Sequence, residues 1–313
     1  MNTPPTTEER IWAVFSHLSS VAFGMGIVLP IIGWSEQRRK SKYASFQCLQ
    51  ALGYQSVGFT VWVLSYLLIV FLGAMILLVT LGSDPAGRQN PINLQTPGLI
   101  VFFLVLFGYF ALYLLLPVLA AIACALGRDF RYPILGHRLT HYLHYEPAQE
   151  AEGQLWLHED HEFRWVAAMG HFSILILLWG MLAPLTALIL QGKHSFFLRF
   201  QSIQTLVYQA GTTLLFVAGG MISALASVAL PLLSLSVFAV DPDSLLLPVG
   251  LIVFIALLLL PLVIILLIVP LFHILGQWAG YRVLKGDNYR YPLVGKLVEK
   301  HISKKSALEE IPE

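Results

Sequence analysis

The chain has 313 residues, of which 57% are hydrophobic and 12% are charged, and its formal net charge is +1. This composition is too apolar for a soluble globular protein of this length, so we expect an integral membrane protein. The balanced charge gives no electrostatic reason to expect a nucleic-acid partner. The expected partner is the lipid bilayer, and other membrane proteins are the candidates for further contacts.

The first apolar run covers residues 11–34 and contains no formally charged side chain. At about 1.5 Å per residue, its length just suffices to cross a hydrocarbon core of about 30 Å. Gly24, Gly26 and Pro30 lie inside it, and such residues break or kink a helix. The residues before the run lack the basic region and cleavage site of a signal peptide, so we expect the run to remain in the mature protein.

A basic cluster follows this run, and the polar stretch Phe46–Gln55 then opens the next helix. Residues 53–82 are uncharged and long enough to span the membrane. Residues 83–96 are rich in Pro, Gly, Asn and Asp, which predicts a loop. A second span is expected at residues 97–127, ended by Gly127.

The chain then repeats this plan. The stretch Phe46–Gln55 recurs as Phe200–Gln209, 154 positions later, and the closing Arg131-Tyr132-Pro133 recurs as Arg290-Tyr291-Pro292. Such self-similarity predicts a tandem duplication of a unit of roughly 130 residues, each with three hydrophobic segments. The predicted parts are a first membrane unit, a polar connector, a second membrane unit and a polar tail, at residues 8–140, 141–161, 162–303 and 304–313.

The last apolar run, residues 244–281, contains Pro248, Pro261 and Pro270. Prolines inside a helix remove backbone hydrogen bonds and bend it. We therefore expect a kinked helix there, in an all-α polytopic membrane protein.

Short motifs mark the first unit: Glu-Arg-x-Trp at residues 9–12, His-Leu-Ser at residues 17–19, a glycine and a proline before Trp34, a glutamine-rich helix start and the closing Arg-Tyr-Pro. In the second unit single positions correspond to these, namely Glu162, Arg164, His171, Ser173, Gly180 and Pro184, and the glutamine-rich start and Arg-Tyr-Pro recur. With these motifs the chain resembles the uncharacterised bacterial membrane-protein domain described as similar to the chloroplast inner-envelope import component Tic-twenty, present as two tandem copies. The resemblance implies a helical multi-pass fold and a role around protein translocation or membrane organisation.

The distribution of basic residues bears on the number of membrane crossings. Basic residues follow the first run and both closing motifs, whereas residues 83–96 and 241–243 are poor in them. All basic segments and the C-terminal tail share one side, expected to be the cytoplasmic side of a bacterial plasma membrane, if each unit crosses an even number of times. Residues 11–34 and 165–192 would then re-enter or lie shallow. Six full crossings, with an inverted second unit, are the alternative.

The repeated stretch supplies the main candidates for a site. Gln47, Gln50 and Tyr54 lie at i, i+3 and i+7 of the predicted helix, so they share one face. This stripe either lines a hydrophilic groove for a peptide or solute, or joins helices through amide hydrogen bonds. The candidate residues are Gln47, Gln50, Tyr54, Gln55, Gln201, Gln204, Tyr208 and Gln209.

Polar residues also recur inside the first run of each unit, namely His17, Ser19, His171 and Ser173. A repeated ionisable residue in a membrane segment is a candidate for a proton-sensitive gate. The alternative is a neutral histidine that donates to a backbone carbonyl freed by the Gly/Pro break.

The connector region carries His137, His141 and His144 at i, i+4 and i+7, followed by His158 and His161. On a helix the first three share a face and could hold a divalent metal, but a solvated interfacial segment explains them equally well. The chain has no zinc-protease motif, nucleophile elbow, phosphate loop or Cys-x-x-Cys. We therefore expect no enzyme activity, no catalytic residue, no metal and no cofactor.

The expected function is that of a channel-like, translocation-associated or scaffolding membrane protein. A small-solute transporter with a cavity between the two units is the alternative. An enzyme that uses the histidine-rich connector is the third hypothesis.

Overall fold

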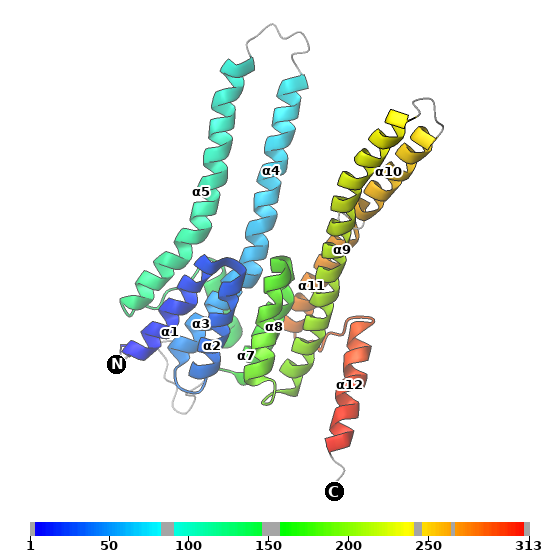
Figure 1. Ribbon diagram of the computed structural model, residues 1–313. Coiled ribbons are helices and arrows are strands. Elements are labelled where there is room, and N and C mark those ends of the chain that lie inside the picture. The colour runs from blue at the N-terminus through cyan, green and yellow to red at the C-terminus, as the bar shows by residue number, and fades with distance from the viewer. Residues whose placement is uncertain (1–3, 83–90, 146–156, 241–245, 264–266, 310–313) are drawn as a thin grey trace.

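The computed structural model describes residues 4–82, 91–145, 157–240, 246–263 and 267–309 (Figure 1). These ranges are almost entirely helical and contain no strand. Five of the helical stretches are long and apolar enough to cross a membrane. The prediction of an all-α polytopic membrane protein is confirmed.

The first half of the chain comprises, in order, α1 (Thr7–Leu18), η1 (Ser19–Ile27), α2 (Val28–Gln37), α3 (Lys42–Gly53), η2 (Tyr54–Gly58), α4 (Phe59–Gly82), α5 (Pro91–Ala125) and α6 (Leu135–Leu143). The second half comprises α7 (Glu159–Phe172), η3 (Ser173–Met181), α8 (Leu182–Gln191), α9 (Phe196–Val240), α10 (Leu246–Val263), α11 (Val269–Leu284) and α12 (Val294–Glu309). In the last apolar run Pro261 lies inside α10 and Pro270 in the first turn of α11, whereas residues 264–266 lie outside the described residues, so the kink there stays a prediction.

The first apolar run of the chain folds back on itself. The Nε2 of Gln37 at the end of α2 donates to Glu8 Oε1 at the start of α1, at 2.9 Å. Nearer the turn, the Cα of Gly33 lies so close to α1 that an added Cβ would be 3.1 Å from the Trp12 ring. These contacts between distant positions make α1 and α2 an antiparallel helical hairpin.

The second apolar run makes the same hairpin from α7 and α8. An added Cβ on Gly170 of α7 would lie 3.5 Å from Pro184 of α8, and the Ser173 hydroxyl donates to the carbonyl of Gly180 at 2.8 Å. Length and composition alone class Thr7–Gln37 and Glu159–Gln191 as single candidate spans. The backbone instead reverses within each of them.

Both hairpins turn at a residue with left-handed backbone geometry, Phe23 with φ 49° and Leu177 with φ 53°. This region favours glycine, so each turn holds a strained non-glycine residue. The arms of the first hairpin have 12 and 10 residues. At 1.5 Å per residue each arm is about 15–18 Å long, which is short of the hydrocarbon core of about 30 Å.

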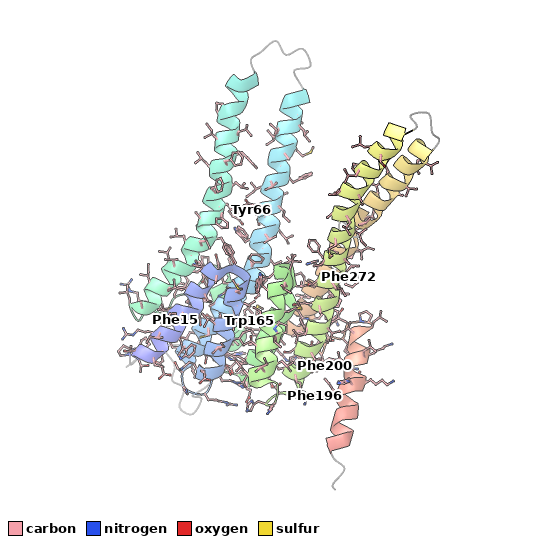
Figure 2. The ribbon with its side chains drawn as sticks, in the orientation of Figure 1. Phe15, Tyr66, Trp165, Phe196, Phe200 and Phe272 are labelled. Atoms are coloured by element: carbon pink, nitrogen blue, oxygen red, sulfur yellow. The ribbon has the colours of Figure 1, made fainter. Side chains whose placement is uncertain are left out.

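Two long helical pairs project from the hairpins, α4 with α5 and α9 with α10 (Figure 1). The ends of α4 and α5 at Gly82 and Pro91, and those of α9 and α10 at Val240 and Leu246, lie at the top in this view, whereas the N-terminus and α12 lie at the bottom. Figure 2 shows side chains extending from all sides of these long helices, many of them large, apolar and exposed. Such surfaces suit contact with lipid.

The predicted spans end where the sequence indicates. Gly127, with φ +75°, ends α5, and Gly286, with φ +101°, ends α11. In both places two backbone bonds close the helix in a Schellman motif, for example Arg128 N to Ala123 O at 2.9 Å. The prediction that Gly127 ends the helix is confirmed.

Other boundaries differ from the prediction. Helix α5 begins at Pro91, inside the predicted loop 83–96, because proline is well suited to the first turn of a helix, where its missing N–H is not needed. Helix α6 crosses the predicted boundary at residue 140, and α12 continues to Glu309 through the predicted start of the tail. Residues 146–156 of the connector lie outside the described residues.

The two halves share one hydrophobic core at the level of the hairpins. It joins Trp34 and Leu49 of the first half to Phe163, Met169 and other buried residues of the second half. Each half also has a smaller aromatic cluster, centred on Tyr54 and Tyr208.

Candidate functional site

His17 is fully buried and forms the centre of the first polar cluster, defined here as knot 1 (His17, Gln47, Gln50, Tyr132). Its Nδ1 lies 3.0 Å from the Tyr132 hydroxyl and its Nε2 lies 3.0 Å from Gln47 Oε1. The amide nitrogen of Gln47 donates to Asp129 and to the carbonyl of Phe130, so Gln47 Oε1 accepts the hydrogen bond from His17. His17 is therefore the neutral Nε2–H tautomer, and Tyr132 donates to its Nδ1.

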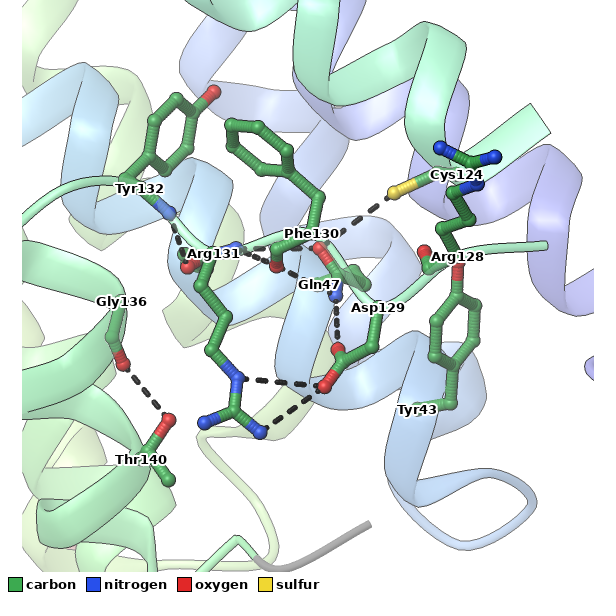
Figure 3. A network of polar contacts seen from close by, with 11 residues as sticks. Tyr43, Gln47, Cys124, Arg128, Asp129, Phe130, Arg131, Tyr132, Gly136 and Thr140 are labelled. Atoms are coloured by element: carbon green, nitrogen blue, oxygen red, sulfur yellow. Dashed lines mark hydrogen bonds and ion pairs between the residues drawn. The ribbon is translucent and has the colours of Figure 1, made fainter. Parts of the chain in front are cut away.

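The glutamines of knot 1 hold the chain segment that follows α5 (Figure 3). Gln47 Nε2 donates to Asp129 Oδ1 at 2.8 Å and to the carbonyl of Phe130 at 3.1 Å. Gln50 Nε2 donates to the same carbonyl at 3.0 Å, while its Oε1 accepts from the Tyr132 backbone N–H at 3.0 Å. The predicted stripe thus binds the closing Arg-Tyr-Pro segment of its own unit.

Knot 2 (His171, Gln201, Gln204, Tyr291) repeats this arrangement in the second half. His171 Nδ1 lies 3.0 Å from the Tyr291 hydroxyl and its Nε2 lies 3.0 Å from Gln201 Oε1. Gln201 Nε2 donates to Asn288 Oδ1 at 2.8 Å, and the backbone N–H of Tyr291 donates to Gln204 Oε1 at 3.4 Å. These bonds join positions 154 or 159 apart from those of knot 1. Knot 2 has one contact more, the Thr205 hydroxyl 3.0 Å from His171 Nδ1.

One hypothesis expected each histidine to donate to a carbonyl of its hairpin turn, but the ring nitrogens of His17 and His171 contact side chains instead. Those carbonyls are satisfied by the last glutamine of each repeated stretch and by the repeated serines. Gln55 Nε2 donates to the carbonyl of Ser16 at 3.1 Å and to the Ser19 hydroxyl at 2.9 Å. In the second half Gln209 Nε2 donates to the carbonyl of Gly170 at 2.8 Å and to the Ser173 hydroxyl at 3.3 Å.

The two tyrosines of the repeated stretch complete the pattern. The Tyr54 hydroxyl donates to the carbonyl of Tyr113 at 2.7 Å, and its ring stacks on Tyr132 with centroids 4.4 Å apart. The Tyr208 hydroxyl donates to the carbonyl of Phe272 at 2.9 Å, and its ring stacks on Tyr291 at 3.8 Å. All eight candidate residues of the two stretches are buried and face protein.

Burial determines the protonation of the groups that follow α5 and α11. It raises the pKa of Tyr132 and of Tyr291 well above the usual value, so both hydroxyls remain protonated donors. Burial also raises the pKa of Asp129, an effect opposed by the adjacent Arg131 guanidinium, whose Nη2 lies 3.2 Å from Asp129 Oδ2. The second half has the uncharged Asn288 at the corresponding position.

Arg38 joins the two halves, a role that the sequence did not indicate. It is only 6% exposed, and its guanidinium donates to Gln191 Oε1 and to Glu159 Oε1, both at 2.9 Å. Glu162, which accepts from the Trp34 indole N–H at 3.1 Å, also lies near the guanidinium, with Oε2 3.6 Å from Nη2. Arg38 therefore fixes α2 of the first half against α7 and α8 of the second.

The histidines of the connector region form pairs at the surface. His137 and His141 are exposed on α6, with their Nε2 atoms 3.3 Å apart. His161 stacks on His144, and the two ring centroids are 5.4 Å apart. Within the described residues, no group of three or more His, Cys, Asp or Glu side chains is arranged to hold a metal ion.

The fold and its buried polar knots define a helical multi-pass integral membrane protein. Residues 8–139, nearly all of the predicted first unit, match the model of a family described as the magnetosome magnetite crystal formation protein family. No curated protein and no solved structure matches the chain. The resemblance to the Tic-twenty-like domain and the duplication stay predictions.

Proposed function

We propose that this protein is a non-enzymatic membrane scaffold. The observation that supports it most is the burial of the repeated polar residues. Gln47, Gln50, Gln201 and Gln204 are each 0% exposed and hydrogen-bonded to their own chain, so they serve as joints between helices. This leaves the apolar surfaces of the long helices for contact with lipid and other membrane proteins.

The process in which the scaffold acts is proposed from similarity alone. Residues 8–139 match a family whose name refers to the formation of magnetite crystals in magnetosomes. Crystal formation in such a compartment is therefore the candidate process. The second unit would present a further apolar helix pair in the same membrane.

The proposed architecture is a parallel tandem duplication with two re-entrant hairpins. Equal His–Gln and His–Tyr distances in knots 1 and 2 support the duplication, and the short arms of α1/α2 and α7/α8 support re-entry. The basic residues beside these hairpins favour a cytoplasmic location for that face.

Reporter fusions test this topology. Fusions after Lys40, after Gly192 and at the C-terminus are expected to report the same side of the membrane, and a fusion after Gly82 the opposite side. A fusion after Lys40 or Gly192 that reports the side opposite to the C-terminus would exclude the even-crossing arrangement and favour six crossings.

Scaffold and transporter are separated by flux and crosslinking. Purified protein in liposomes is expected to show no saturable solute flux. A photo-crosslinker at exposed Phe107 or Leu214 in the native membrane is expected to capture discrete membrane proteins, whereas one at buried Leu49 serves as the negative control. Saturable solute flux together with a lack of such crosslinks would contradict the scaffold proposal and favour a transporter.

A further inference from the structure

The exposed histidine pair on α6 is in hydrogen-bond contact through its two Nε2 atoms, at a separation that also suits a chelate. The Nε2 atoms of His137 and His141 are 3.3 Å apart, and the two ring planes stand at 89°. Two metal–nitrogen bonds of about 2.0–2.1 Å at a tetrahedral angle place their nitrogens about 3.3–3.4 Å apart. The observed separation equals the span that one metal ion requires.

We propose that His137 and His141 bind a divalent cation of intermediate softness, such as Zn²⁺, Ni²⁺ or Cu²⁺, through their two Nε2 atoms. Imidazole nitrogen is a preferred ligand of these ions, whereas Mg²⁺ and Ca²⁺ prefer oxygen. Two further positions of a four-coordinate ion remain open to water or to a ligand from another molecule. The proposal does not depend on the scaffold function.

The helix that carries the pair is held in place on its opposite face. Leu139 and Leu143 are 0% exposed in the shared core, and the Thr140 hydroxyl donates to the carbonyl of Gly136 at 2.9 Å. Helix α6 is closed by its C-cap His144, which has left-handed backbone geometry and whose N–H donates to the carbonyl of His141. The two rings therefore project from a fixed backbone, which reduces the ordering that metal binding requires.

The pair is specific to the first half of the chain. Gly136 and Gly295 hold corresponding places, so Lys296 and Lys300 of α12 correspond to His137 and His141. Both lysines are exposed, and a lysine ammonium cannot bind a metal. Since the corresponding helix α12 forms with lysines there, the histidines are not needed to fold the motif.

This correspondence supplies a matched variant, His137→Lys with His141→Lys. Isothermal titration calorimetry would use the purified full-length protein and Zn²⁺, Ni²⁺ or Cu²⁺ separately. Loss of a group outside the ligand shell already weakens metal binding by about 10–100-fold, so each single substitution to alanine is expected to weaken it at least about tenfold. The double lysine variant is expected to lose this binding altogether.

Two substitutions serve as controls. His301→Ala removes an exposed histidine of α12 whose neighbours four residues away are Leu297 and Lys305, and His158→Ala removes one from the other histidine group. Both are expected to keep wild-type affinity. Absence of binding by the wild type, equal binding by the double variant, greater loss with His158→Ala, or displacement of Zn²⁺ by millimolar Mg²⁺ would overturn the proposal.

Discussion

Replacing Arg38 by methionine is expected to destabilise the protein mainly through Glu162. Glu162 is 2% exposed, and the Arg38 guanidinium is the cation beside its carboxylate, at 3.6 Å. Removing one partner of a buried ion pair costs about 3–5 kcal/mol where the other partner stays charged. A buried carboxyl can take up a proton instead, so this figure is the upper bound for Glu162. Glu159 adds little, because its side chain is 43% exposed and water can replace the arginine, which limits that contribution to about 0–1 kcal/mol.

The two buried free cysteines, Cys48 and Cys124, provide an assay. A thiol-reactive dye labels them only when the protein unfolds, so a thermal ramp in detergent gives a midpoint. The lower end of about 2–4 °C per kcal/mol suits a chain of this length, so the Arg38→Met midpoint is expected to fall by at most about 6–10 °C.

Two further variants isolate the cause. Arg39→Met removes a guanidinium that is 56% exposed and contacts only Glu159 among the ion pairs of the described residues, so its midpoint is expected to change little. Glu162→Gln in the Arg38→Met background removes the unpaired charge and is expected to restore most of the loss. A double variant as unstable as Arg38→Met, or an equal fall with Arg39→Met, would refute the role given to Glu162.

The same thermal assay checks three further expectations. Gly26→Ala is expected to destabilise the protein severely, because an added Cβ would lie 1.8 Å from the carbonyl oxygen of Ser19. The control Gly220→Ala meets nothing within 4 Å and is expected to stabilise α9 by about 0.5–1 kcal/mol. Equal effects of the two substitutions would contradict the hairpin geometry. Tyr132→Phe leaves the buried Nδ1 of His17 without a donor and is expected to cost about 1–3 kcal/mol, so an unchanged midpoint would exclude the assigned tautomer. The pKa of Asp129 is raised in the folded state, so the contribution of this residue to stability is complete below the unfolded pKa and is lost as pH rises through the folded pKa. Asp129→Asn, which copies Asn288, is expected to remove that part of the pH dependence of stability. An unaltered pH profile would exclude Asp129 as its source.

Local signals in the sequence predicted the helices and their ends. Composition predicts the all-α membrane fold, and Gly127 predicts the end of α5 because it supplies the left-handed residue of a Schellman motif. The proline-rich character of residues 83–96 misled the loop prediction, because composition does not distinguish a proline in a loop from Pro91 at the start of a helix. Such boundaries depend on a single turn of backbone.

The site was predictable only in part, because its bonds join distant positions. The repeat identifies Gln47 and His17 as candidates, and the 154-residue period predicts that Gln201 and His171 behave alike. Tyr132 lies 115 positions from His17, and no sequence spacing links the two. The sequence places Arg38 only in the basic cluster after the first apolar run, since its bonds to the second half depend on how the halves pack.

Corresponding positions therefore divide into two groups with different physical roles. Those that keep their residue type, such as His17 and His171, make the same buried bonds in both halves, which each hairpin needs to satisfy its interior. Those that differ give each half contacts of its own, such as the Thr205 hydroxyl 3.0 Å from His171 Nδ1, where the first half has Ala51. Arg38 corresponds to Gly192, so at this position the first half has a guanidinium and the second half has none. An exchange of these two residues would leave both knots intact but place the cation on the wrong half, so knot bonding and inter-half packing are separable properties of the chain.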